Sequence, residues 1–538
     1  MTDLSSDQAI GQKLMLAFEG LQAPAHFLDI LMRRGAGGIT LFRHLNVESP
    51  AQVRALTALL QAAAAESGHP LLLIAADQEG GQLVALGKGT TAFPGNMALG
   101  ATQDADLARR VGYAQGQELA ALGVNVNYGP VCDVNTNPQN PNVGVRAFGD
   151  DPELASTMAA AMVAGLQAAG VAATAKHFPG NGDSGLDPHF GVPVLAHDLE
   201  RLGEVEFPPF RAAIDAGVRL VMTAHVGVPA LTGDPGLPAT LSGAIMRDLL
   251  RDELGFTGLL ISDALDMQAI SQGAGQIIDA LAAVRAGVDL LLLAADPEAQ
   301  VRLYEGLRLA LARGLLEEED LQSSARRVLA LKRWLAMQAQ PELEVVGCAK
   351  HHELEREVAR RAVTLVRDRS GLLPLDLPAE ARIAAIMPKP QDLTPADTSS
   401  LIQPGLAPAL RRYGRRVDSF VVAHAPSPVD IALLKEATAT YDLLVVGTAS
   451  AHLCPEQGAM VRELLTLAVP VVTVALRTPY DLLAYPQADT HACTYSLQPC
   501  AMEALAATLW GQASFQGRLP VTIPGLYPLG HGMSAGGG

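Results

Sequence analysis

The sequence predicts two α/β domains: an N-terminal (β/α)8 barrel of the TIM type over residues 1–340 and a smaller C-terminal α/β sandwich over residues 381–530. Short apolar runs alternate with amphipathic helical stretches in the first domain, as in a parallel sheet whose strands are covered by helices. Eight such runs match the strand number of a closed barrel. An open, doubly wound sheet is the alternative architecture.

The eight runs span four to six residues each, the length of buried strands. They lie at residues 14–17, 38–42, 71–76, 124–128, 172–176, 219–223, 259–263 and 288–293.

Polar side chains stand at the ends of five of these runs, where a barrel carries its catalytic groups. They are Asp77, Asn127, Lys176 with His177, His225 and Asp263. Five strands that end in this way are difficult to attribute to chance, so we expect an active site at this edge of the barrel.

The second domain begins after a predicted linker at residues 341–380, which contains the proline-punctuated segment 372–378. Helical stretches separate several of the five apolar runs that follow, which favours an α/β layered domain. These runs lie at residues 383–387, 418–423, 443–446, 471–476 and 492–495. The glycine-ended segment 531–538 is predicted to be a disordered tail.

Composition excludes several classes of function. The formal net charge of -17 disfavours nucleic acid and anionic membranes as partners. The five cysteines have no zinc-site spacing, and we predict neither a metal nor an organic cofactor. The apolar runs are too short to insert in a membrane, and no secretory signal begins the sequence, so we expect a cytoplasmic protein.

The loop at residues 176–189 concentrates ionisable groups after a buried strand. In it, Asp187 and His189 stand two residues apart, and an Asp can fix the tautomer and tune the pKa of a neighbouring His. Such a pair can deliver and retrieve a proton near neutral pH. The alternative is a surface loop with an incidental histidine.

The remaining candidates could bind a substrate or attack it. Asp263 could be a carboxylate nucleophile at the mouth of the barrel, or the N-cap of a helix. Lys176 and His177 could donate hydrogen bonds to hydroxyls or an anion, although Lys176 could also form a structural ion pair. Asp77 could accept two hydroxyl protons, and Arg146 is a further binding candidate that could equally be a surface charge.

The chain resembles the bacterial β-N-acetylglucosaminidases of glycoside hydrolase family 3, in the two-domain subgroup. The most specific element is the Lys-His-Phe-Pro-Gly segment at 176–180, followed by Asp187 and His189. Other similar segments lie at residues 10–15, 77–81, 93–97, 222–225, 238–242, 262–264, 477–481 and 517–521.

This resemblance implies a role for each candidate. Asp263 corresponds to an aspartate that attacks the anomeric carbon, so that a glycosyl-enzyme forms and configuration is retained. His189, paired with Asp187, corresponds to the general acid/base, which departs from the usual pair of carboxylates. In the family, the side chains at the positions of Asp77, Arg146, Lys176 and His177 bind the sugar, and we expect the same here.

Three positions depart from the family pattern. Asn181 stands where a histidine is usual, and Pro188, whose ring fixes φ, stands where Ser or Thr is usual. Ala85 replaces an arginine that contacts the sugar in relatives. We expect activity to survive with altered affinity, because every group needed to break the bond is present.

The expected activity is release of terminal GlcNAc from chitin-derived fragments or, in peptidoglycan recycling, from muropeptides. One alternative is phosphorolysis, since a histidine does not repel an incoming phosphate as a carboxylate would. A second is a β-glucosidase or β-xylosidase, with Glu456 as acid/base, and a third is a catalytically dead sugar-binding protein. The partner is a small carbohydrate, and the oligomeric state stays open.

Overall fold

Eight parallel strands form the first sheet in the computed structural model, which describes residues 4–414 and 416–534. They are β1 (Leu14–Leu16), β2 (Gly38–Thr40), β3 (Leu73–Ala76), β6 (Val126–Asn127), β7 (Ala172–Phe178), β8 (Leu220–Thr223), β9 (Leu259–Ile261) and β10 (Leu291–Leu292). Their order is β10-β1-β2-β3-β6-β7-β8-β9, and a parallel bridge between Ile261 and Leu290 joins the two ends of the sheet. Every strand overlaps a predicted run, so the barrel is confirmed and the open sheet is excluded.

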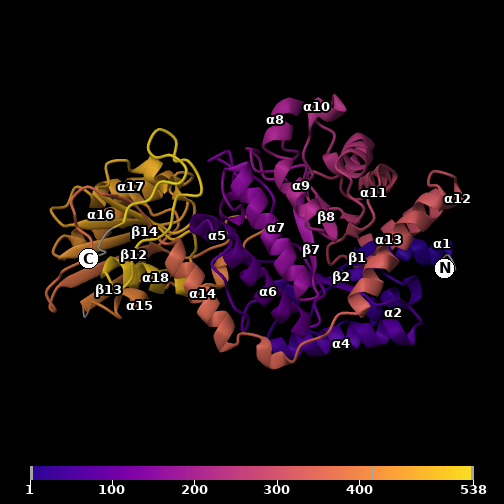
Figure 1. The fold of residues 1–538 in the computed structure, drawn as a ribbon, viewed down its shortest axis with the longest axis horizontal. Coiled ribbons are helices and arrows are strands. Elements are labelled where there is room, and N and C mark those ends of the chain that lie inside the picture. The colour runs from indigo at the N-terminus through magenta and orange to yellow at the C-terminus, as the bar shows by residue number, and fades with distance from the viewer. Residues whose placement is uncertain (1–3, 415, 535–538) are drawn as a thin grey trace.

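Helices surround this ring of strands (Figure 1). They are α1 (Ser6–Gly11), α2 (Ala25–Arg34), α3 (Arg43–Asn46), α4 (Pro50–Glu66), α5 (Asn96–Thr102), α6 (Ala105–Ala121), α7 (Pro152–Ala168), α8 (Leu199–Glu204), α9 (Pro208–Asp215), α10 (Pro229–Thr232), α11 (Gly275–Ala286), α12 (Pro297–Ala312) and α13 (Glu318–Ala336). The long helices α4, α7 and α12 each begin with a proline after a Ser or Asp whose side chain accepts from a backbone N–H of the first turn. This arrangement satisfies free donors and presets φ at the helix start.

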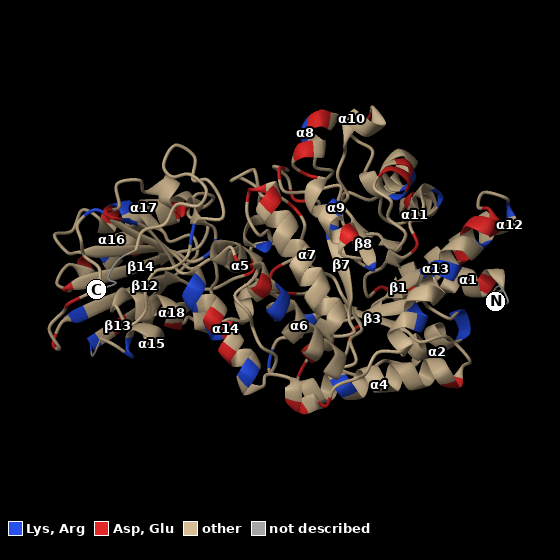
Figure 2. Ribbon diagram, in the orientation of Figure 1, with Lys and Arg blue, Asp and Glu red and all other residues tan. Residues whose placement is uncertain are grey.

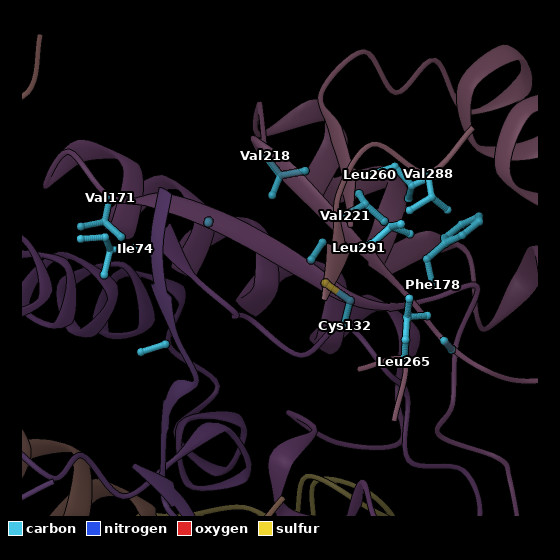
Figure 3. Close-up of a cluster of buried hydrophobic side chains, with 14 of the residues drawn as sticks. Ile74, Cys132, Val171, Phe178, Val218, Val221, Leu260, Leu265, Val288 and Leu291 are labelled. Atoms are coloured by element: carbon cyan, nitrogen blue, oxygen red, sulfur yellow. The ribbon is translucent and has the colours of Figure 1, made fainter. Parts of the chain in front are cut away.

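The barrel strands are apolar on both faces because each face packs against its own layer. On β3, Leu73 and Ala75 point into the barrel, while Ile74 and Ala76 pack outward beneath the helices. Figure 3 shows labelled members of the outer layer from several strands, among them Val221. This alternation explains why the strand sequences are continuously apolar.

The second domain contains a six-stranded mixed sheet with the order β11-β16-β15-β14-β12-β13. Its strands are β11 (Thr364–Asp368), β12 (Arg382–Pro388), β13 (Arg416–Val422), β14 (Leu443–Thr448), β15 (Val471–Ala475) and β16 (Thr490–Cys493). Only the β11–β16 pairing is antiparallel. The helices α15 (Leu406–Leu410) and α18 (Pro499–Leu509) cover one face, and α16 (Pro428–Thr438) and α17 (Pro455–Leu464) cover the other. This is the α/β sandwich that the sequence predicts.

Regular structure occupies much of the predicted linker. Helix α14 (Ala349–Ala362) contacts α5 of the barrel and α18, and β11 forms an edge of the second sheet. The prolines at 374 and 378 therefore follow this helix and strand, and they do not mark the whole segment as irregular. In the predicted tail, the Met533 amide donates to the Leu365 carbonyl at 2.8 Å, whereas residues 535–538 lie outside the described residues.

Charged side chains of both signs are interspersed on the helices of both domains (Figure 2). No helix within residues 4–414 and 416–534 combines the length and the apolarity that crossing a membrane requires.

Candidate active site

A hairpin that follows β3 brings two carboxylates to the mouth of the barrel. Asp77 begins it, and its strands β4 (Gln78–Gly80) and β5 (Leu83–Val84) place Glu79 beside Asp77. Gly81 has φ +60°, and a Cβ there would lie 2.9 Å from the Pro94 carbonyl oxygen, so this close turn requires glycine. Asn127, predicted as a strand-end residue, fixes the hairpin by bonding to the N–H and the carbonyl of Gln78.

The two carboxylates bind two buried cations. Lys176 Nζ lies 2.6 Å from both Asp77 Oδ1 and Glu79 Oε1. Arg146 forms a two-bonded fork with Glu79, with distances of 2.8 and 2.9 Å. Burial alone would raise the pKa of Glu79, but Arg146 and Lys176 outweigh it and lower the pKa to about 2. The mouth of the barrel therefore holds Glu79 as a carboxylate, hydrogen-bonded to both cations.

The same arginine connects to His177. Arg146 Nη1 donates to Asn142 Oδ1 at 3.0 Å, and its Nη2 lies 3.4 Å from His177 Nε2. His177 Nδ1 faces Asp133 Oδ2 at 2.7 Å, and the other Asp133 oxygen accepts from the Asn181 N–H at 2.8 Å. Asp133 thus orients His177 so that Nε2 faces the cavity.

Asp263 follows β9 and is not a helix N-cap, since α11 begins only at Gly275. Its Oδ1 accepts from the Ala264 N–H at 2.8 Å. Burial would raise the pKa of Asp263, but His177, His225, the Ala264 N–H and Lys176 lower it below its usual value. An ionised carboxylate is the form that can act as a nucleophile.

His225 supports this position from behind. Its ring is fully buried, with Nδ1 at 2.7 Å from Thr240 Oγ1 and Nε2 at 3.1 Å from the Ala264 carbonyl oxygen. Burial lowers the pKa of His225. It therefore positions the segment that carries Asp263 and does not face the cavity.

The loop after β7 carries the predicted proton-transfer pair. His189 Nδ1 lies 2.6 Å from Asp187 Oδ1, and the same oxygen accepts from the His189 backbone N–H at 2.9 Å. Burial opposes protonation of the imidazole, but the hydrogen bond and the charge of Asp187 outweigh it, so the pKa of His189 is raised. The Pro188 carbonyl accepts from the Ala269 N–H at 3.2 Å, which joins this loop to the segment after Asp263.

One cavity brings these groups together. Six of the seven predicted side chains line it: Asp77, Arg146, Lys176, His177, His189 and Asp263. The seventh, Asp187, contacts His189 from behind. The cavity also has apolar lining residues, among them Leu41, Leu83, Ala85, Pro395 and Ala396.

Several residues of the site have roles that the sequence did not reveal. Glu79 stands in the recognised segment 77–81 but its bridge between Arg146 and Lys176 was not predicted. Asp133 follows β6 by several residues, and its position after a buried run was the only available signal. The second domain contributes residues 395–398 to the cavity, which no sequence pattern indicated.

Two of the departures have structural partners. Asn181 Oδ1 accepts from Ser184 Oγ at 2.7 Å, inside the loop that carries His189. Pro188 is buried, and its carbonyl makes the contact with Ala269 described above. By contrast, Glu456, the alternative acid/base, is exposed and does not line the cavity.

The arrangement can hold a polyhydroxylated ring against charged donors and acceptors, and can present a carboxylate and an imidazole to it. Within the described part of the chain, no group of three or more His, Cys, Asp or Glu side chains could hold a metal ion.

Comparison with known proteins gives a consistent result. The model of the glycosyl hydrolase family 3 N-terminal domain matches residues 7–331. The chain is 32% identical to β-hexosaminidase A of Pseudoalteromonas piscicida, over 97% of each chain. It is 30% identical to a β-N-acetylglucosaminidase/β-glucosidase of Cellulomonas fimi, over 97% of this chain and 94% of the relative.

A solved structure extends the similarity to both domains. The glycoside hydrolase family 3 β-N-acetylglucosaminidase from Paenibacillus sp. str. FPU-7 superposes with a TM-score of 0.92 and 37% sequence identity. The alignment covers 97% of this chain and 99% of that one.

Proposed function

The chain belongs to glycoside hydrolase family 3 and is a glycoside hydrolase, and we propose that it is a retaining β-N-acetylglucosaminidase. One observation carries this proposal: a single cavity holds an ionised Asp263 and the His189–Asp187 pair beside a set of buried sugar-binding charges. The names of the similar proteins support GlcNAc as the terminal sugar.

In the first step, the Asp263 carboxylate attacks the anomeric carbon while His189 donates its Nε2 proton to the glycosidic oxygen. The bond between that carbon and oxygen breaks, the aglycone leaves with the proton, and a glycosyl ester forms on Asp263. Asp187 holds Nδ1, so Nε2 is the nitrogen that can reach the substrate. The raised pKa keeps the imidazole protonated for this step.

In the second step, the neutral His189 accepts a proton from water while the water oxygen attacks the same carbon. The ester bond breaks, and Asp263 leaves as a carboxylate. Two inversions at one carbon retain the configuration. Lys176, Arg146, His177 and Asp77 hold the sugar hydroxyls throughout.

We further propose that the substrate comes from peptidoglycan or chitin fragments and that the enzyme acts on muropeptides in the cytoplasm. All five cysteines are free, which supports a reducing compartment. Incubation with an anhydro-muropeptide and with chitobiose, followed by chromatography of the products, would rank the two substrates. Release of GlcNAc from chitobiose alone would contradict the muropeptide assignment.

The activity is tested with p-nitrophenyl N-acetyl-β-glucosaminide and p-nitrophenyl β-glucoside in phosphate-free buffer. We expect preference for the N-acetyl sugar, and NMR should show the β-anomer as the first product. Preference for the glucoside would contradict the proposed substrate. Release of the α-anomer as the first product would contradict a retaining mechanism. Binding without turnover, unaffected by Asp263→Asn, would indicate a sugar-binding protein without catalysis.

Phosphorolysis is the second candidate, because the acid/base is an imidazole and not an anion. Addition of phosphate separates the two reactions by their products. Hydrolysis gives free GlcNAc at every phosphate concentration, whereas phosphorolysis gives GlcNAc-1-phosphate in rising proportion.

A further inference from the structure

The wall of the cavity beside Ala85 lacks the arginine that the family resemblance leads one to expect. Ala85 is buried and lines the cavity, and its N–H donates to the Asp77 carbonyl at 3.2 Å. A methyl group at this point offers no hydrogen bond to a sugar.

A different guanidinium lies next to this point. Arg43, from the short helix α3 after β2, also lines the cavity, and its Nη1 donates to the carbonyl of Val84 at 3.1 Å. Val84 is the residue before Ala85, so the guanidinium reaches the same hairpin from a different strand of the barrel.

Arg43 is not engaged in an ion pair with any described residue. Burial lowers the pKa of Arg43, and the carboxylate of Asp392 acts on it only through its charge. Of the five N–H donors of a guanidinium, one bonds to the Val84 carbonyl, and no other hydrogen bond of this side chain to a described residue is present.

The hairpin is also shaped to admit this side chain. Gly87 has φ +53°, and a Cβ added there would lie 2.5 Å from Arg43 Nε and 2.6 Å from its Cζ. A side chain at 87 would therefore displace the guanidinium, which is free to move because it ends a flexible chain.

We propose that Arg43 binds oxygens of the terminal sugar and replaces, from a different strand, the arginine that position 85 lacks. This inference rests on the proposed function. It makes Arg43 a residue that sets affinity for the terminal sugar and not a participant in bond breaking.

Kinetics of matched variants on p-nitrophenyl N-acetyl-β-glucosaminide test it. We expect Arg43→Ala to raise KM roughly 10- to 100-fold, the size of one or two hydrogen bonds to a charged group, with kcat little changed. Adding Ala85→Arg to Arg43→Ala should lower KM again. Ala85→Arg alone should weaken binding, because two guanidiniums would then lie side by side.

A second test leaves the charge of Arg43 in place and displaces its guanidinium instead. Gly87→Ala should raise KM in the wild-type chain but not in the Arg43→Ala chain. Gly68→Ala is the matched control, because Gly68 also has a positive φ, +71°, but has no atom within 4 Å of an added Cβ. Thermal melting confirms that each variant is folded.

An unchanged KM in Arg43→Ala would overturn the proposal, as would an equal effect of Gly87→Ala in both backgrounds. Failure of Ala85→Arg to restore binding in the Arg43→Ala chain would overturn the replacement of one arginine by the other. If Arg43→Ala weakened the binding only of substrates with an anionic aglycone, Arg43 would bind the aglycone and not the terminal sugar. That result would also overturn the proposal. Calorimetric binding of GlcNAc distinguishes failure of this proposal from failure of the proposed function. An inactive wild type that still binds GlcNAc would contradict the proposed function but not the role of Arg43.

Discussion

Two buried clusters of charge lie at opposite ends of the barrel and are built from the same kinds of residue. At the ends of the strands, Lys176 and Arg146 bind Asp77 and Glu79. At their beginnings, Asp289 precedes β10 and binds the two arginines 251 and 327. Because all eight strands are parallel, the first cluster faces the cavity and the second faces away from it.

The two clusters differ in what remains unbonded. Both oxygens of Asp289 are occupied, by Arg327 at 3.0 and 2.7 Å and by Arg251 Nη2 and the Leu260 N–H at 2.7 and 2.9 Å. Asp77 bonds to Lys176 through Oδ1 alone, and its side chain is 24% exposed. A buried charge cluster is therefore not evidence of a binding site by itself. We call the cluster at the ends of the strands the upper cluster and the one at their beginnings the lower cluster. The upper cluster is distinguished by acceptors that are left free toward a cavity, with a nucleophile and a proton donor beside them.

The largest loss of turnover is expected from a change at Asp263, beside the upper cluster. We expect Asp263→Asn to lower turnover by at least about 10³-fold, because an amide cannot form the glycosyl ester. The melting temperature should change little, since among the described residues the carboxylate accepts one hydrogen bond, from the Ala264 N–H. Turnover and thermal melting measured on the same preparation check both statements, and retained turnover would remove Asp263 from the mechanism.

Asp289→Asn should have the opposite profile. Loss of the carboxylate leaves two arginine side chains without their partner, and breaking a buried pair in this way costs about 3–5 kcal/mol. Arg251 and Arg327 also hold the pKa of Asp289 below its usual value, although burial opposes this. The contribution of Asp289 to stability is thus present above its unfolded-state pKa and is lost as the pH falls through the folded-state value.

Thermal melting from neutral to acidic pH measures this contribution. The wild type should lose stability on acidification, and the variant should begin lower and lose less. Surviving protein should keep the wild-type KM. A changed KM with an unchanged melting temperature would show that the lower cluster affects the site and would remove the distinction between the two ends.

The sequence could predict the upper cluster in part, for physical reasons. Asp77, Lys176 and Asp263 directly follow apolar runs, and the ends of parallel strands meet at one edge. Arg43 also directly follows an apolar run, at residues 38–42, but a short helix begins there and the residue was not singled out. The contact between Gln82 and Ala396 joins residues 314 positions apart, and local periodicity carries no information about it.

Local sequence patterns also predict most of the fold but miss one strand. The eight barrel strands and the four strands β12, β14, β15 and β16 are largely buried apolar runs and could be found by pattern. The run at 418–423 also marked β13, although this edge strand is mostly exposed. Strand β11 is an edge strand that pairs antiparallel with β16 and lies shortly before two prolines, so its segment was predicted to be a linker. The individual site roles stay predictions until variants are measured.

Replacement of Asp187 tests whether the His189–Asp187 pair transfers protons to and from the substrate. Its buried Oδ2 has no partner among the described residues, so Oδ1 and the imidazole carry its function. Asp187→Asn should move the alkaline limb of kcat/KM to lower pH, because Asp187 raises the pKa of His189 and the acid must be protonated. The loss at neutral pH should be smaller than the ~10²–10⁴-fold that general acid–base catalysis contributes. An unshifted limb would show that a group other than His189 sets it.

The smallest effect is expected where the second domain reaches the upper end. Arg477 Nη1 donates to Asp397 Oδ2 at 2.7 Å, and Thr398 Oγ1 accepts from the Val84 N–H at 3.2 Å, so residues 395–398 are fixed against the hairpin. Arg477 does not line the cavity that holds Asp263. Arg477→Ala should therefore raise KM by less than about tenfold, below the effect of one hydrogen bond to a charged group.

Two further variants show whether the effect on KM comes from the placement of residues 395–398 against the hairpin. Arg477→Lys keeps the charge and should recover part of the affinity. Arg412→Ala removes an exposed ion pair with Glu503, 2.9 Å long, elsewhere in the second domain and should leave KM unchanged. If Arg477→Ala behaved like Arg412→Ala, the wall at 395–398 would not depend on this ion pair. The upper end would then differ from the lower one only in the residues that the barrel itself supplies.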